Sequence, residues 1–224
     1  MKSRVLFTSL LMASSISIAH AEDGLGSEKQ KLSYAVGVQI GQDLKRNGMD
    51  IDASSVAMAI DDIMAGNTPK LTMDEMQVVF ADYQKKEMAK KELAGQANMA
   101  EGEAFLAANK DKDGVTVLPS GLQYKVITAG AGKQPTAEST VSVHYRGTLL
   151  NGSEFDSSYK RGEPATFPVN GVIKGWTEAL QLMKEGDKWQ LFIPSDLAYG
   201  PRGAGADIGP NSVLTFEVEL LSVK

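Results

Sequence analysis

The stretch Gly171-Val172-Ile173-Lys174-Gly175-Trp176 decides how the second half of the chain folds. Two β-branched apolar residues shortly precede a tryptophan, and this tryptophan opens a short helix-like segment, residues 177–183. Large apolar side chains at a strand-like end and at the start of a helix converge on one spot. The stretch therefore predicts the floor and wall of a small apolar pocket.

The sequence around this stretch has a β pattern from Gly114 onward. Turns rich in Gly and Pro separate short apolar runs, which predict strands at residues 122–127, 140–148, 165–169, 188–193 and 213–223. In the last run, apolar side chains alternate with polar ones, which predicts that one face of the sheet is buried and the other is exposed to solvent. We predict an α+β domain, an antiparallel β half-barrel wrapped on the short helix near residues 176–183.

The chain before Gly114 has a helical pattern. Apolar side chains recur on one face of residues 28–45 and of residues 53–65, which predicts two short helices. Thr72 and Glu75 have the spacing of a capping box, and no proline follows until Pro119. We expect a third helix from Thr72 to about residue 109, roughly 55 Å long at about 1.5 Å per residue.

The long helix has two unlike parts. Its start, from Met73 to Tyr83, carries an apolar stripe and is expected to be buried, whereas residues 85–103 are expected to form a solvated strut. Methionines are frequent in residues 49–99, and Met fills irregular interfaces well. A module of about 60 residues is a marginal core on its own. We therefore expect homodimerisation through these helices; the alternative is a plain helical core filled with Met.

The first 21 residues resemble a secretory signal. Lys2 and Arg4 precede an apolar run that ends in Ala19-His20-Ala21, and the run is too short to span a membrane. The alternative is an amphipathic N-terminal segment. We predict a signal peptide at 1–21, a helical dimerisation domain at 22–70, a connecting helix at 71–113 and the pocket-bearing domain at 114–224.

Composition excludes several classes of function. The chain has no Cys, and removal of residues 1–21 leaves one His, so a zinc site built on His and Cys is impossible. The remaining 21 basic and 28 acidic residues give a net charge of −7, which disfavours nucleic acid as a partner. His144 lies opposite the apolar face of its strand and is expected to be a solvated residue. What remains is an apolar pocket with one carboxylate, Asp156, and two hydroxyls, Tyr145 and Tyr199.

These segments, in this order and at these spacings, resemble the FKBP-type peptidyl-prolyl cis-trans isomerases over about residues 121–224. The preceding signal and helices resemble the macrophage infectivity potentiator group of secreted bacterial isomerases. The resemblance implies an enzyme that rotates X-Pro bonds in proline-containing peptides and unfolded proteins. It also implies binding of macrolide inhibitors of this family, no cofactor, no metal and no transmembrane segment. The implied location is the periplasm, with the outer membrane or cell surface as alternatives.

The resemblance also assigns the site. By position, the implied catalytic residues are Tyr145, Asp156, Tyr199 and Phe216, and the implied substrate-binding residues are Phe155, Phe167, Val172, Ile173, Trp176 and Ile208. Ala165 stands where some members carry a pocket aromatic, so we expect Phe167 to form that wall. Ala204 stands at a loop position that is often His. A rival hypothesis is a dimeric chaperone or host-surface binding protein in which isomerase activity is secondary.

Overall fold

The computed structural model describes residues 24–224. The signal peptide predicted at residues 1–21 lies outside the described residues. The chain divides into two compact units, of which the first ends at Lys45 and the second is Arg46–Lys224. Within residues 24–224, no helix has both the length and the hydropathy that a membrane crossing requires.

The two short helices form where the sequence predicts them. Helix α1 is Glu28–Arg46 and α2 is Ala53–Met64, and the Asp52 side chain caps α2 by accepting a hydrogen bond from the backbone N–H of Ser55. Neither helix buries a residue in the single chain. Large apolar side chains of these helices are therefore exposed to solvent in the single chain, among them Leu32, which is 68% exposed.

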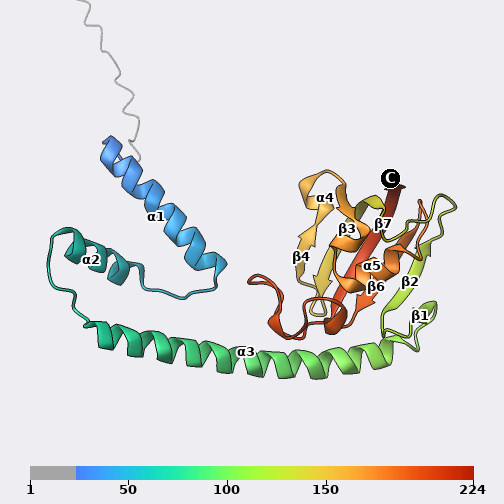
Figure 1. Ribbon diagram of the computed structural model, residues 1–224, viewed down its shortest axis with the longest axis horizontal. Helices are drawn as coiled ribbons and strands as arrows, with labels where there is room; N and C mark the ends of the chain where they lie inside the picture. Colours follow the sequence, from blue (N-terminus) through green and yellow to red (C-terminus); the bar gives the residue numbers. More distant parts are fainter. Residues whose placement is uncertain (1–23) are drawn as a thin grey trace, which may run out of the picture. The chain divides into compact units, whose positions relative to one another are not determined.

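The third helix, α3, is Met73–Asn109 and runs without a break (Figure 1). Its predicted capping box is confirmed: the backbone N–H of Glu75 donates to the Thr72 hydroxyl at 3.2 Å, and the Glu75 carboxylate accepts from the Thr72 N–H at 2.8 Å. These two bonds satisfy backbone donors that the first turn of a helix otherwise leaves free.

The burial of α3 differs from its sequence pattern in the first part of the helix and agrees with it along most of the second part. The apolar first part is exposed in the single chain, with Phe80 at 61% exposure. Residues 85–103, predicted as a solvated strut, are exposed or partly exposed except for Gly95 and Gly102. Together with Asn109, these buried residues recur every seven residues on one face. Because two of these residues lack a side chain, the face can approach the C-terminal domain closely: a methyl group added at Gly102 would lie 2.6 Å from Val213 Cγ2.

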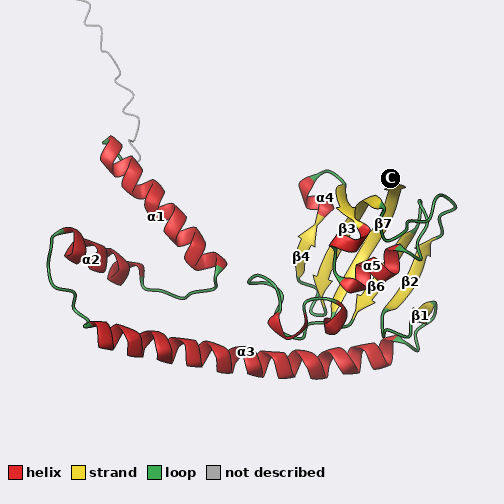
Figure 2. Ribbon diagram, viewed as in Figure 1, coloured by secondary structure: helices red, strands yellow, loops and turns green. Residues whose placement is uncertain are grey.

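The C-terminal domain is built on a seven-stranded antiparallel sheet within residues 24–224 (Figure 2). The strand order is β1-β2-β6-β7-β3-β4, and β5 pairs with the other half of the outer edge of β3. The strands are β1 (Val115–Val117), β2 (Gln123–Thr128), β3 (Thr140–Leu149), β4 (Glu154–Ser157), β5 (Ala165–Pro168), β6 (Lys188–Ile193) and β7 (Leu214–Val223).

One helix covers the apolar face of this sheet. Helix α5 (Lys174–Leu180) begins two residues before the predicted start, and its Ala179 and Leu180 are fully buried. They pack in one core with the inward side chains of β3 and β7, such as Val143 and Val218. The outward residues of β7 are only partly buried, so the predicted alternation is confirmed.

The strands that the sequence pattern missed are short. The five predicted strands are confirmed with bounds that differ by one residue at most, but β1 and β4 span three and four residues and were not predicted. The one-turn helix α4 (Ser158–Arg161) was not predicted either. Such segments hold too few residues for a periodicity to be recognised, because two or three alternations also occur in loops.

Candidate active site

A cavity of about 410 Å³ opens on the face of the sheet that α5 covers. Its volume lies in the range of about 300–1,000 Å³ that small-ligand sites occupy. Nine of the ten predicted site residues line it, and Ile208 does not. Within residues 24–224, the lining comprises Tyr145, Phe155, Asp156, Phe167, Gly171, Val172, Ile173, Trp176, Tyr199 and Phe216.

The sheet register brings the lining residues together. On β3, Tyr145 and Gly147 point to the same face, and Gly147 lies opposite both Phe216 on β7 and Asp156 on β4. A Cβ atom at Gly147 would lie 2.6 Å from the Phe155 ring and 2.7 Å from the Phe216 ring. The two rings therefore occupy the space that a side chain at position 147 would take.

Trp176 is the centre of the aromatic wall. It is 4% exposed, and its ring meets those of Tyr145 and Phe216 at centroid distances of 5.2 Å each, both close to edge-on. Phe167 also meets Trp176 edge-on, at 5.9 Å. Edge-to-face pairs at these distances are favourable beyond the area they bury, by about 0.5–1.5 kcal/mol each. The rings thus hold one another in place while their outer faces line the cavity.

The polar groups of the cavity gather on one rim. The Tyr145 hydroxyl donates to one oxygen of the Asp156 carboxylate, and Arg161 Nη1 donates to the other oxygen at 2.6 Å. Arg161 Nη2 also donates to the Tyr145 hydroxyl at 2.9 Å, and the guanidinium lies 5.4 Å from the centre of the Tyr145 ring. One cation thus fixes both groups of the rim.

The same contacts shift the pKa values of the rim. Partial burial would raise the pKa of Asp156, but the hydrogen bonds from Tyr145 and Arg161 outweigh it and hold that pKa below its usual value. Burial, reinforced by the hydrogen bond to Asp156, raises the pKa of Tyr145. At neutral pH the rim therefore presents a carboxylate and a protonated phenol.

Arg161 is the functional candidate that the sequence pattern missed. Helix α4 turns the chain back after β4, and this turn returns Arg161 to Asp156 five residues earlier. No linear pattern marks this contact, because it depends on the turn of α4 and on Gly162, whose left-handed conformation ends that helix.

Three further predicted residues have definite places. Tyr199 lies in the loop between β6 and β7, lines the cavity and is 41% exposed. Ile208 lies further along that loop in the buried core, paired with Ala204. Phe167 is part of the cavity wall, whereas Ala165 is packed against the core and is absent from the lining.

His144 is on the opposite face of β3, as predicted, but it is not a freely solvated residue. It is partly buried, its ring stacks on Tyr159 at 4.8 Å, and its Nδ1 lies 2.9 Å from the Ser158 hydroxyl. Helix α4, which the sequence pattern missed, supplies both contacts. His144 is partly shielded from solvent because α4 covers this part of the outer face of β3.

Comparison with known proteins gives concordant matches to both parts of the chain. Residues 131–221 match the family model described as FKBP-type peptidyl-prolyl cis-trans isomerase, and residues 29–126 match the domain amino terminal to it. The outer membrane protein MIP of Legionella longbeachae is 47% identical over 226 residues, 98% of this chain and 97% of that protein.

Two further proteins match over most of their length. The peptidyl-prolyl cis-trans isomerase Mip of Coxiella burnetii is 45% identical over 210 residues, covering 92% of this chain and 91% of that protein. The crystal structure of FkpA from Escherichia coli matches with a TM-score of 0.62 and 37% identity, over 89% of this chain and 98% of that one.

Proposed function

The chain belongs to the FKBP-type peptidyl-prolyl cis-trans isomerases, and from this premise we propose that its cavity accelerates X-Pro rotation by stabilising a twisted amide without covalent chemistry. The observation that carries this mechanism is the arrangement of the cavity, in which aromatic and aliphatic walls surround a space that few polar groups border, with Tyr145 and Asp156 hydrogen-bonded to each other. The rival hypothesis of a binding protein with secondary isomerase activity is not favoured, because relatives that match along the chain are named as isomerases.

The reaction itself needs little more than such a cavity. Rotation of an X-Pro bond must overcome a barrier of about 18–20 kcal/mol from amide resonance, although the two isomers differ by only about 0.5–1 kcal/mol. In the half-rotated state the nitrogen and carbonyl are decoupled, so charge separation falls. An apolar site therefore binds the twisted amide better than the planar one, which is the condition for catalysis.

Each side of the cavity has a role in this proposal. Trp176, Val172 and Phe216 surround the prolyl ring. The backbone N–H of Ile173 donates to a substrate carbonyl, and this role is supported because that N–H makes no hydrogen bond within residues 24–224. The Tyr199 hydroxyl donates to a second carbonyl at the open side. Asp156 and Tyr145 face the carbonyl of the residue before proline or fix the polar rim.

Three variants test this assignment. We expect Tyr199→Phe to reduce kcat/KM by less than about tenfold, because one hydrogen bond contributes about 0.5–1.5 kcal/mol. Asp156→Ala and Phe216→Ala should reduce it more, since the first leaves Arg161 and Tyr145 without their shared partner and the second opens the wall. The assay is cis/trans exchange of a proline tetrapeptide. Full activity in all three variants would show that the site is wrongly assigned.

We also propose that the chain is a homodimer through its N-terminal helices. This is supported by helices α1 and α2, which bury no residue in the single chain and expose apolar side chains that usually mark an interface. We expect the mature protein to have twice the mass of one chain in solution. Ile40→Glu should yield the monomer mass, whereas the matched control Gln39→Glu on the same exposed helix should not. A monomeric wild-type protein would contradict the proposal.

Location and inhibitor binding are part of the same proposal. The signal-like residues 1–21 support export to the periplasm, and the name of the Legionella longbeachae relative supports association with the outer membrane. A macrolide that fills the cavity should inhibit turnover by competing with the prolyl ring. Cell fractionation tests the location, and tetrapeptide exchange with and without the macrolide tests the inhibition.

A further inference from the structure

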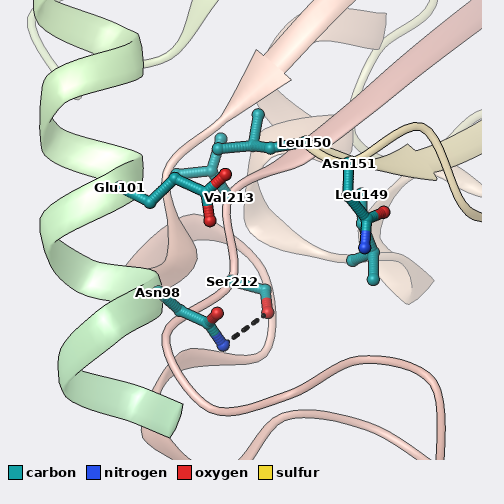
Figure 3. Close-up of a pocket in the computed structure, with 7 residues that line it drawn as sticks. All are labelled: Asn98, Glu101, Leu149, Leu150, Asn151, Ser212 and Val213. Carbon is teal, nitrogen blue, oxygen red and sulfur yellow. Dashed lines mark hydrogen bonds between the residues drawn. The ribbon is translucent and has the colours of Figure 1, made fainter.

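The second half of α3 is hydrogen-bonded to the loop that follows β6. Asn98 Nδ2 donates to the carbonyl oxygen of Pro210 at 2.8 Å. It also lies 3.3 Å from the Ser212 hydroxyl (Figure 3). In return, Asn211 Nδ2 donates to the carbonyl oxygen of Gly95 in α3 at 3.2 Å. Gly95 permits this approach, because a Cβ atom there would lie 3.2 Å from Pro210. We call the Asn98 and Asn211 contacts the amide clamp.

Asn211 joins the amide clamp to the cavity. Its backbone N–H donates to the carbonyl oxygen of Gly200 at 2.9 Å, and Gly200 follows Tyr199 directly. Asn211 has a φ of +57°, the only positive φ outside glycine in residues 24–224, and asparagine is one of the few residues that adopt it readily. One residue therefore holds α3 with its side chain and the Tyr199 segment with its backbone.

The rest of the loop is braced in the same way. The backbone N–H of Gly203 donates to Gly200 at 3.3 Å, and Ala204 and Ile208 exchange two backbone hydrogen bonds at 2.9 and 3.1 Å. A displacement of Asn211 is therefore expected to displace Gly200 as well, because the hydrogen bonds of the loop leave it little freedom to adjust. Trp176, by contrast, is held by its ring contacts and lies on the buried face of α5.

We propose that α3 positions the active site: the amide clamp fixes the Tyr199 segment at the open side of the cavity, which makes Asn98 and Asn211 positioning residues. This inference rests on the proposed role of Tyr199 in binding a substrate carbonyl. It gives the long helix a part in catalysis beyond that of a connector. The rings of the aromatic wall hold one another by their own contacts, so we expect the effect to be confined to the groups that Tyr199 supplies.

Two substitutions break the clamp with little other change. Asn211→Gly removes the hydrogen bond to Gly95 and keeps the left-handed backbone, because glycine adopts positive φ without strain. Asn98→Ala removes both bonds of Asn98, and alanine is the best helix former. Gln96→Ala is the matched control, because Gln96 is an exposed side chain two residues away on α3.

The full-length mature protein is used throughout, with two readouts. We expect kcat/KM on a proline tetrapeptide to fall about two- to tenfold in each clamp variant, at most the loss from removing the one substrate hydrogen bond of Tyr199, and to stay unchanged in Gln96→Ala. We also expect amide hydrogen exchange at residue 211 to accelerate in Asn98→Ala, because this amide is the donor to Gly200. A merely structural weakening of α3 would not change that single amide selectively.

A double-mutant cycle decides whether the effect passes through Tyr199. In a Tyr199→Phe background, Asn211→Gly should cost less than about twofold, because the hydroxyl that it displaces is already gone. Unchanged turnover or unchanged exchange in the clamp variants would overturn the proposal, and so would an equal loss in both backgrounds. Failure of the proposed function gives a different result, because it is seen without any clamp substitution. Either the wild-type protein is inactive, or Tyr199→Phe is fully active.

Discussion

The substitution Gly147→Ala should distort the cavity by displacing the two aromatic rings that pack against Gly147. The added methyl would lie 2.6 Å from the Phe155 ring and 2.7 Å from the Phe216 ring, whereas carbon atoms prefer about 3.6 Å, so each ring must withdraw by about 1 Å. Overpacking of this kind costs about 1–3 kcal/mol. Alanine regains about 0.5–1 kcal/mol over glycine within a strand. We therefore expect the free energy of unfolding to fall by about 1–2 kcal/mol.

The loss of activity should exceed the loss of stability. Because a misplacement of about 1 Å can cost about 100-fold in rate, we expect kcat/KM to fall about 10- to 100-fold in tetrapeptide exchange. Val143→Ala is the control: Val143 is a fully buried residue of the same strand outside the cavity lining, and its truncation should cost about 2 kcal/mol and leave kcat/KM within about twofold. A Gly147→Ala variant with reduced stability and full kcat/KM would refute the claim that these rings shape the site.

Two further predictions concern the polar rim. First, kcat/KM should be constant from about pH 5 to 9, because the pKa of Asp156 lies below its usual value and that of Tyr145 above its usual value. The stabilising contribution of the Asp156 carboxylate is complete above its unfolded pKa, near 4, and is lost as the pH falls through the lower folded pKa; a step in a pH profile of tetrapeptide exchange near pH 6 would contradict this. Second, Arg161→Leu should raise the pKa of Asp156 and reduce kcat/KM about two- to fivefold. Arg161→Lys should recover part of the activity, because lysine keeps the charge but cannot contact Asp156 and Tyr145 with two N–H groups of one guanidinium. Equal activity of the wild type and both variants would count against a role for Arg161.

The regular elements were predictable because their side chains have a period. The alternation along β7 and the capping box at Thr72 are local signals, and both are confirmed. The docking face of α3 has no such signal in a hydrophobic pattern, because glycine carries no apolar side chain. Gly95, Gly102 and Asn109 could have been found only as a seven-residue repeat of small or polar positions.

The sequence predicted the residues that line the cavity but not the residues that hold them in position. The aromatic wall around Trp176 follows from conspicuous rings at spacings that resemble a known family, and the structure gathers nine of the ten assigned residues around one cavity. Arg161 and Asn211 were missed because their contacts depend on backbone turns, the one-turn helix α4 and a left-handed residue at 211. Such turns place a side chain by geometry that a linear pattern does not encode.

The most direct test is isomerase turnover of the mature protein when its cavity is filled. Uncatalysed X-Pro exchange takes tens to hundreds of seconds, so acceleration is easily measured on a proline tetrapeptide. We predict strong acceleration that is abolished when one macrolide molecule is bound per chain. Exchange at the uncatalysed rate, or undiminished turnover with the cavity occupied, would contradict the claim that this apolar cavity stabilises the twisted amide.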